Sequence, residues 1–360
     1  MPATATKTWI EATTTFIVIV AWFVANISLS NITKWLYMNG QVCAQVSGKR
    51  HCQSYEFPIA ITCFHMIFCW GVCHIYLRCR RRDPHATAGE TLPLASTPIQ
   101  KRSSLFSLAC CFSASVAMGN ASLQYIFPSF NQMLASMSPL ITVFMSVAVM
   151  RKSYNWWTWM SMPIICGGLI LCCGREANFH LTGAMLAIGA TLLRALKSVM
   201  QEKLLVDPAE RLDSVTLLYY MSPHAALLLF IASLIFEGVA PIRLLLPFHL
   251  PFIGLPLDTA QVTGVPVLVS ILLASCIAAC ILNLTGNEVT KLTSAVMLQV
   301  LGNLKACLLI LVSVAIFKNK LEPLQAVGMS ICLFGMWIYQ SKGAVVSEDV
   351  KPAVGAKSMP

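Results

Sequence analysis

The sequence predicts an all-α polytopic membrane protein with ten transmembrane helices arranged as two inverted five-helix repeats. Of its 360 residues, 57% are hydrophobic and only 11% are charged, whereas soluble globular domains carry about 25% charged residues. Apolar runs of membrane-spanning length recur from one end of the chain to the other. An internal similarity between residues 147–168 and 314–335 predicts the repeat.

Ten apolar runs are expected to cross the membrane, since a helix needs about 20 apolar residues to span the hydrocarbon core. The runs are 11–36, 57–78, 104–122, 127–150, 156–174, 181–204, 214–237, 263–284, 291–317 and 322–341. The first run is too long for a signal-peptide core, and no Arg- and Ser-rich transit peptide precedes it. We therefore expect a retained signal-anchor helix and insertion through the endoplasmic reticulum.

The charges in the loops predict the orientation. If both termini are cytosolic, the cytosolic segments hold fourteen lysines and arginines and the opposite side holds six. This asymmetry satisfies the positive-inside rule, so we expect both termini, including the tail 342–360, in the cytosol. Cys43 and Cys52 then share a lumenal loop, where the paired and the free states are both open alternatives.

The internal repeat aligns VAVMRKSYNWWTWMSMPIICGG (147–168) with VAIFKNKLEPLQAVGMSICLFG (314–335) without gaps, at an offset of 167 residues. The fourth and fifth runs then correspond to the ninth and tenth, which gives repeats at 11–174 and 181–341. Because five spans is an odd number, the two halves must be inverted in the membrane. Inverted repeats are typical of secondary transporters, with the substrate site at the repeat interface. Chance similarity between two apolar hairpins is the alternative.

Basic residues within the apolar runs indicate the kind of ligand. Lys34, Arg194, Lys197, Lys291 and Lys305 lie in or at the edge of these runs, and the sequence offers them no obvious carboxylate partners. A lysine in hydrocarbon costs roughly 2.5–3.5 kcal/mol. We therefore expect a mobile anion to supply the countercharge. For the two lysines nearest run ends, Lys34 and Lys291, snorkelling to the interface is the alternative.

Other polar residues accompany these cations. Gln132, Ser136 and Pro139 follow the spacing of one helix face and predict a polar stripe with a kink. Tyr220 could stack on a base or ring, although aromatic residues near helix ends more often belong to the interfacial belt. His65 is most simply a satisfied packing histidine, with a cavity-lining role as the second interpretation.

The ninth run holds Gly302, which would let the backbone approach a neighbour or a ligand, and Asn303, which would add a neutral donor. We expect Lys305 to bind the substrate at the membrane midplane. Lys291 lies fourteen residues earlier, about 21 Å along a helix, so we expect it to steer substrate or to gate one mouth.

Enzyme, metal and nucleic-acid signatures are absent from the sequence. We find no HExxH, GxSxG, GxGxxG or P-loop pattern and no zinc-type cysteine spacing. The net charge is +10, but the basic residues are dispersed rather than gathered on a face with aromatic residues. We therefore expect no catalytic residues, no metal, no cofactor and no nucleic-acid partner.

Four stretches, 122–145, 178–205, 212–230 and 283–319, resemble the triose-phosphate and nucleotide-sugar translocator family of the drug/metabolite transporter superfamily. The nearest branch looks like the Lys-Thr group of Golgi nucleotide-sugar transporters, which includes plant-type UDP-sugar carriers. The resemblance would make Lys291 and Thr293 the Lys-Thr pair of this group.

One departure from the family pattern bears on the substrate. Plastid triose-phosphate carriers have adjacent lysine and arginine after the Gly-Asn of the ninth helix, and both hold phosphate. Here Gly302 and Asn303 are followed by Leu304, Lys305 and Ala306. The resemblance, with this departure, disfavours a small phosphorylated triose.

The resemblance thus implies a multi-pass antiporter of the Golgi membrane, with the endoplasmic reticulum as the alternative location. It would exchange a cytosolic UDP-sugar for lumenal UMP. The alternatives are a sugar-phosphate or phosphoenolpyruvate/phosphate antiporter and a non-transporting membrane protein. Membrane lipid is an expected partner, and the oligomeric state is open, with a homodimer among the arrangements. The candidate substrate-binding residues are Asn31, Lys34, His65, Gln132, Arg194, Lys197, Tyr220, Lys291, Thr293, Asn303 and Lys305.

Overall fold

The computed structural model describes residues 2–46, 49–82, 99–173, 180–207, 212–245, 264–317 and 323–343. Within these ranges, seven helices are long and apolar enough to cross a membrane. Two shorter apolar helices, Trp156–Leu171 and Ala295–Leu308, fall on the predicted fifth and ninth runs. The protein is therefore an all-α polytopic membrane protein, and the expected tail lies outside the described residues from position 344 onward.

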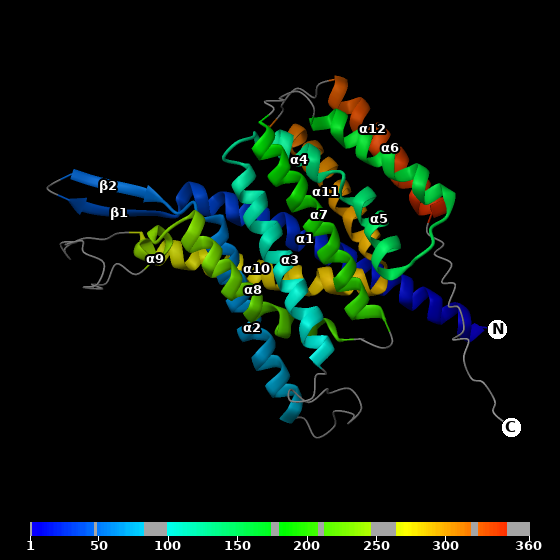
Figure 1. The fold of residues 1–360 in the computed structure, drawn as a ribbon, viewed down its shortest axis with the longest axis horizontal. Coiled ribbons are helices and arrows are strands. Elements are labelled where there is room, and N and C mark those ends of the chain that lie inside the picture. The colour runs from blue at the N-terminus through cyan, green and yellow to red at the C-terminus, as the bar shows by residue number, and fades with distance from the viewer. Residues whose placement is uncertain are drawn as a thin grey trace. The chain divides into compact units, whose positions relative to one another are not determined.

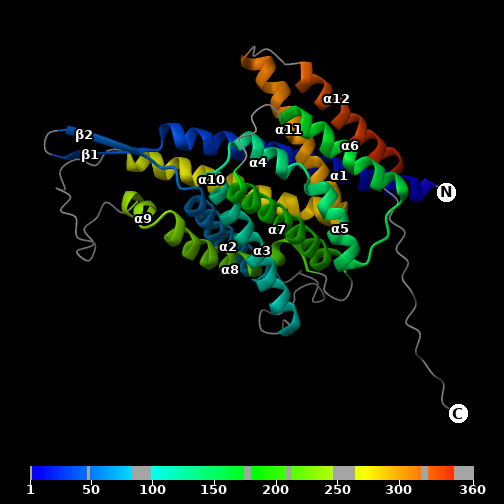
Figure 2. The ribbon, with the colours of Figure 1, turned by 45° about the horizontal axis from the view of Figure 1, so that its top comes forward.

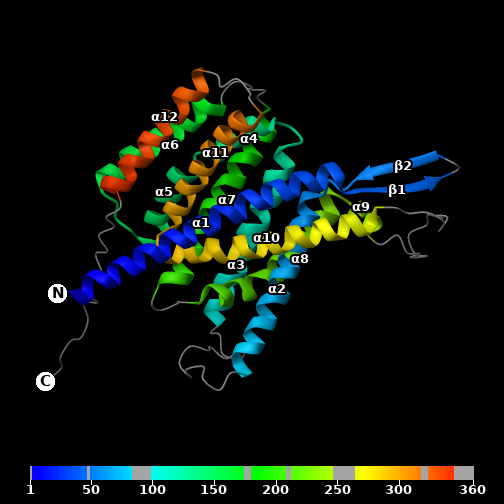
Figure 3. The same ribbon diagram turned by 180° about the vertical axis from the view of Figure 1, so that it is seen from behind.

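The chain folds into two compact units, which we describe separately. The first unit comprises Met1–Gln124 and Met200–Ser294. Its elements are α1 (Pro2–Asn39), β1 (Gln41–Val46), β2 (Lys49–Ser54), α2 (Pro58–Arg82), α3 (Ile99–Ser122), the end of α7, α8 (Ser214–Phe236), α9 (Ala240–Leu245) and α10 (Val265–Leu292). In this unit α2 and α3 pack against α8, and α1 runs alongside α10 (Figure 3).

The second unit comprises Tyr125–Val199 and Ala295–Pro360. Its elements are α4 (Pro128–Ala135), α5 (Ser138–Met150), α6 (Trp156–Cys173), most of α7 (Leu181–Val206), α11 (Ala295–Phe317), α12 (Pro323–Ile338) and a short π-helical turn, η2 (Tyr339–Gly343). Helix α6 lies alongside α12 (Figures 1 and 2). Each unit thus contains helices from both halves of the chain.

Two glycines allow α6 and α12 to approach each other closely. A Cβ atom at Gly168 would collide with the backbone of Cys332, and one at Gly335 would collide with the backbone of Ile165. The sequence alignment matches Gly168 with Gly335, and the same offset carries Ile165 onto Cys332. Applying the offset of the predicted repeat therefore turns the residues of one contact into the residues of the other.

A β-hairpin and a disulfide follow α1. Strands β1 and β2 pair antiparallel, with Cys43 opposite Cys52, and the two cysteines form a disulfide. Of the two alternatives, a disulfide and two free thiols, the structure therefore has the disulfide. The strands themselves were not predicted and only a loop was expected, since two short polar strands carry little of the alternating hydrophobicity that predicts a strand.

The predicted boundary between the eighth and ninth runs is wrong. Helix α10 does not end at 284 but continues to Leu292, and α11 begins at Ala295. The polar side chains that lowered the hydropathy find acceptors within the same helix: Asn283 donates to the carbonyl of Ala279 and Thr290 to that of Gly286. Hydropathy marks contact with the membrane and does not mark the end of a helix.

The expected kink in the fourth run is confirmed as a complete break. Helix α4 ends at Ala135 and α5 begins at Ser138, one residue before Pro139. The three residues of the expected polar stripe differ in exposure, since Gln132 is exposed whereas Ser136 and Pro139 are buried. Proline lacks the backbone N–H that would continue the helical hydrogen bonding, which explains the break at this position.

Candidate functional site

Three basic residues lie in one neighbourhood of the second unit. Arg194 and Lys197 occupy one turn of α7, and Lys305 lies on α11. Arg194 is exposed, while the two lysines are half-buried. Arg194 repels both lysines electrostatically. Like charges gathered in this way destabilise one another, and a bound anion would relieve the repulsion.

A short hydrogen-bond chain joins α11 to the basic turn of α7. Gln299 on α11 donates from Nε2 to Ser198 Oγ at 2.7 Å. Ser198 is buried, and its hydroxyl donates to the backbone carbonyl of Arg194 at 3.0 Å. The helix turn that carries Arg194 and Lys197 is therefore bonded directly to α11.

Asn303 joins α11 to the break between α4 and α5. Its Nδ2 donates to the carbonyl of Ser136 at 3.0 Å, and the asparagine is buried. Ser136 is the C-cap of α4, so Asn303 satisfies a carbonyl at a helix end. The donor expected for a ligand is thus engaged by the protein. The close protein neighbour expected at Gly302 is also wrong, because a Cβ there would meet nothing within 4 Å.

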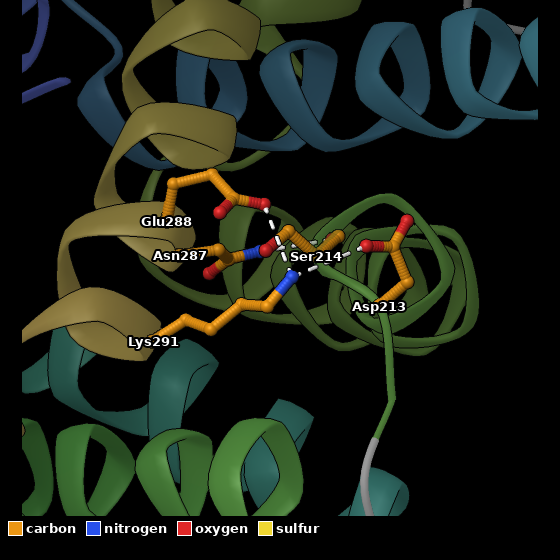
Figure 4. Close-up of polar contacts among 5 residues, drawn as sticks. All are labelled: Asp213, Ser214, Asn287, Glu288 and Lys291. Carbon is orange, nitrogen blue, oxygen red and sulfur yellow. Dashed lines mark hydrogen bonds and ion pairs between the residues drawn. The ribbon is translucent and has the colours of Figure 1, made fainter. Parts of the chain in front are cut away.

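Lys291 in the first unit has a different environment, shown in Figure 4. Its Nζ lies 3.6 Å from Asp213 Oδ1 and 3.8 Å from Glu288 Oε1. Glu288 precedes it by three residues on α10, and Asp213 is the N-cap of α8. The expectation that the basic residues lack carboxylate partners is therefore wrong for Lys291. It also lies in the last turn of α10, not in the same helix as Lys305.

Amide groups beside this ion pair connect three helix ends. Asn287 Nδ2 donates to the carbonyl of Ser214 at 3.1 Å, as drawn in Figure 4. Gln201 Nε2 donates to Asn287 Oδ1 at 2.7 Å. The last turns of α10 are thus bonded to the end of α7 and to the start of α8. Lys291 belongs to a polar cluster internal to the first unit.

The other candidates in the first unit are separated from this cluster or serve the fold. Asn31 and Lys34 are exposed on α1. Thr293 is the C-cap of α10, and its hydroxyl donates to the carbonyl of Val289. This local bond gives Thr293 a role in ending the helix.

Two further candidates of the first unit are engaged by neighbouring side chains. His65 is buried, with Nε2 at 3.1 Å from Ser275 Oγ. This arrangement agrees with the packing interpretation, and we do not carry His65 into the proposed site. Tyr220 packs edge-to-face on Tyr219, with ring centroids 5.3 Å apart.

Of the eleven candidates, the second unit brings together Arg194, Lys197 and Lys305 and places Asn303 beside them on α11. Gln299 and Ser198 were not among the predicted site residues. Gln299 follows Gln132 by the repeat offset of 167 residues, so extending the alignment toward the N-terminus of each copy would have indicated it. Within the described ranges, no group of three His, Cys, Asp or Glu residues could hold a metal ion.

Comparison with known proteins identifies the family to which the sequence is similar. Residues 16–340 match the Triose-phosphate Transporter family. A probable sugar phosphate/phosphate translocator of Arabidopsis thaliana is 32% identical over 325 residues, which cover 89% of this chain and 93% of the relative. UDP-uronic acid transporter 1 of the same plant is 30% identical, with coverage of 89% and 93%. UDP-galactose transporter 1 is 27% identical, with coverage of 89% and 84%.

A solved structure at 13% identity covers 90% of this chain and 98% of its own with a TM-score of 0.59, which indicates a shared fold. The family match, by contrast, spans nearly the whole chain and includes both units. The chain therefore belongs to the triose-phosphate transporter family, whose members are membrane transporters and not enzymes.

Proposed function

We propose that this protein is a secondary antiporter that exchanges a cytosolic nucleotide sugar, with a UDP-sugar favoured, for a lumenal nucleoside monophosphate, UMP. The observation that carries the proposal is that Arg194 and Lys197 share one turn of α7 and that Lys305 of α11 lies within electrostatic reach of Arg194. These residues would bind the pyrophosphate of the nucleotide sugar and the phosphate of UMP. Gln132, in the same unit, is a further proposed contributor to substrate contacts.

The charges of the two substrates suit one shared site. A pyrophosphate linkage carries about two negative charges, and a nucleoside monophosphate carries nearly two at pH 7. Either substrate would balance positive charge in the site as the carrier closes, and closing over excess positive charge without an anion is costly. The empty carrier would therefore reorient slowly, and exchange would be coupled and almost electroneutral.

We further propose that the ten predicted runs form two inverted repeats. The exchanged contacts Gly168–Cys332 and Gly335–Ile165 support this arrangement. Ser136 and Asn303 support it independently, since they are separated by the same 167 residues and contact each other. Two equivalent positions can touch only near the axis that relates them. Transporters with inverted repeats bind substrate at such an interface.

The ion pairs of Lys291 lead us to revise its proposed role. Because Asp213 and Glu288 already balance its charge, we propose that Lys291 anchors α10 to α8 instead of contacting substrate. With both termini cytosolic, this anchor would lie at the cytosolic end of the protein. The proposed location is the Golgi membrane, with the endoplasmic reticulum as the alternative, and a homodimer is one arrangement for the oligomeric state.

Exchange of a sugar phosphate or phosphoenolpyruvate for phosphate is the second candidate function. It is favoured by the similarity to a probable sugar phosphate/phosphate translocator. Against it stands the single basic residue, Lys305, that follows Gly302 and Asn303 in place of adjacent lysine and arginine.

Counterflow into liposomes tests the proposal. Purified protein is reconstituted with internal UMP and offered labelled UDP-sugars, GDP-mannose, a hexose phosphate, phosphoenolpyruvate and phosphate. We expect UDP-sugar uptake that requires internal UMP. Uptake of sugar phosphates by phosphate-loaded liposomes, with none of UDP-sugars, would overturn the proposal in favour of the second candidate.

A further inference from the structure

We infer that Gln299 and Ser198 are positioning residues that set the separation between the anion-binding cations of α7 and α11. The inference rests on the proposed function of Arg194, Lys197 and Lys305. Neither Gln299 nor Ser198 is proposed to touch the substrate.

The geometry of the hydrogen-bond chain supports this role. The Ser198 hydroxyl donates to the Arg194 carbonyl four residues earlier, so its proton is already used within α7. Its oxygen remains an acceptor, and Gln299 donates to it from α11. Because the Ser198 hydroxyl is held by its own helix, its position is well defined. The hydrogen bond from Gln299 therefore positions α11 relative to that turn of α7.

That turn is the one that carries the cations. Lys197 is adjacent to Ser198 in sequence, and Arg194 supplies the carbonyl at the end of the chain. On the other helix, Lys305 follows Gln299 by six residues, or about 9 Å along α11. The bond therefore lies near the basic residues of both helices without involving their charged groups.

A second bond completes the support of α11. Asn303, one turn after Gln299, donates to the Ser136 carbonyl at the end of α4. Helix α11 is thus bonded to α7 by Gln299 and to α4 by Asn303. Repulsion between Arg194 and Lys305 tends to separate α7 from α11, and the bond between Gln299 and Ser198 opposes that separation in the empty carrier.

The consequence concerns the size of the anion. A single phosphate can contact all three cations only when they are close together, whereas a pyrophosphate can bridge a wider gap. Loss of the bond between Gln299 and Ser198 should therefore weaken binding of UMP more than binding of a UDP-sugar. A residue with only a structural role would reduce the amount of folded protein without changing this ratio.

The test compares Ser198→Ala, Gln299→Leu and the double variant in reconstituted exchange. We expect each single variant to raise the KM for UMP by roughly 3- to 10-fold, the range of one hydrogen bond, with a smaller rise for UDP-glucose and little change in kcat. The double variant should resemble the single variants because both act through one bond. Ser198→Thr, which keeps the hydroxyl, should restore the wild-type ratio.

Ser161→Ala is the matched control, since the Ser161 hydroxyl is buried in α6 and donates to the Thr158 carbonyl of its own helix. Equal rises for both substrates, or effects that multiply in the double variant, would overturn the inference and leave the proposed function intact.

The proposed function can fail separately. If the wild-type protein exchanges neither UMP nor UDP-glucose, the same variants are compared by the rise in Tm that inorganic phosphate and pyrophosphate produce in detergent. A selective loss of the phosphate effect would support the positioning role, and an unchanged ratio of the two effects would overturn it.

Discussion

The two units hold their basic residues in opposite ways. In the first unit, Lys291 lies between the carboxylates of Asp213 and Glu288. In the second unit, Arg194 repels both Lys197 and Lys305. A cation balanced by carboxylates of the protein contributes to the fold and gains little from a mobile anion. Repulsion of this kind would be relieved by a bound anion. The sequence alone shows five similar basic residues. In the structure, Lys291 differs from Lys197 and Lys305 because it lies between two carboxylates.

The largest expected effect is at the basic residues of the second unit. Replacing Lys197 or Lys305 with glutamine keeps a hydrogen-bond donor on a side chain of similar size but removes the charge that would bind phosphate. We expect each change to lower the exchange rate by about 100-fold, the upper range for a hydrogen bond to a charged group. The measurement is UMP/UDP-sugar exchange at matched protein levels, with Lys203→Gln in the last turn of α7 as the control. Exchange at the wild-type rate in both variants would contradict the comparison.

A smaller effect is expected at Lys291. Its partners are partly exposed, and such ion pairs contribute about 0.2–1 kcal/mol. Lys291→Gln should therefore lower the Tm by a few degrees at most and leave the KM for UMP unchanged within about twofold. The variant Asp213→Asn should have a similar effect, and the double variant should lose little more because the two residues share one interaction. A KM for Lys291→Gln that rises as far as that for Lys197→Gln would place Lys291 in the substrate site.

The β-hairpin tests the orientation that places the Lys291 cluster on the cytosolic side. We expect Cys43 and Cys52 to resist a membrane-impermeant maleimide in sealed, correctly oriented vesicles, both before and after addition of an impermeant reductant. Labelling should require permeabilisation together with reduction, since the two cysteines form a disulfide and we propose that the hairpin is lumenal. Labelling in sealed vesicles after the impermeant reductant would place the hairpin in the cytosol and reverse the orientation.

The smallest expected effect is at Lys34. Its side chain is exposed on α1, so we expect it to attract anionic substrate over a distance rather than to hold it. Lys34→Gln should lower kcat/KM by about threefold or less at low salt, and the difference should disappear near 0.5 M salt because such attraction is screened. A salt-independent loss would show direct contact with the substrate.

Much of the fold could be predicted from composition and hydropathy. The apolar runs, the break before Pro139 and the shared turn of Arg194 and Lys197 all follow from local sequence. The repeat offset of 167 residues also predicted a correspondence between Gly168 and Gly335, and both glycines lie where α6 and α12 approach each other. These features depend on residues near one another in the chain or on a regular offset.

The partners of the candidate site residues could not be predicted in this way. The ion pair between Asp213 and Lys291 joins residues 78 positions apart in the sequence, and the bond between Gln299 and Ser198 spans 101. Hydropathy also could not show that α10 continues to Leu292, because its polar side chains bond their own backbone. Long-range pairing depends on how helices pack, and no local pattern carries that information.

The central claim is that the anionic substrate binds the cations of the second unit and not Lys291. The most direct test measures the Kd for UMP of purified wild type, Lys197→Gln and Lys291→Gln by titration calorimetry in detergent. We expect a rise of about 100-fold for Lys197→Gln and a change within about twofold for Lys291→Gln. Equal rises in the two variants, or an unchanged Kd in Lys197→Gln, would contradict the claim.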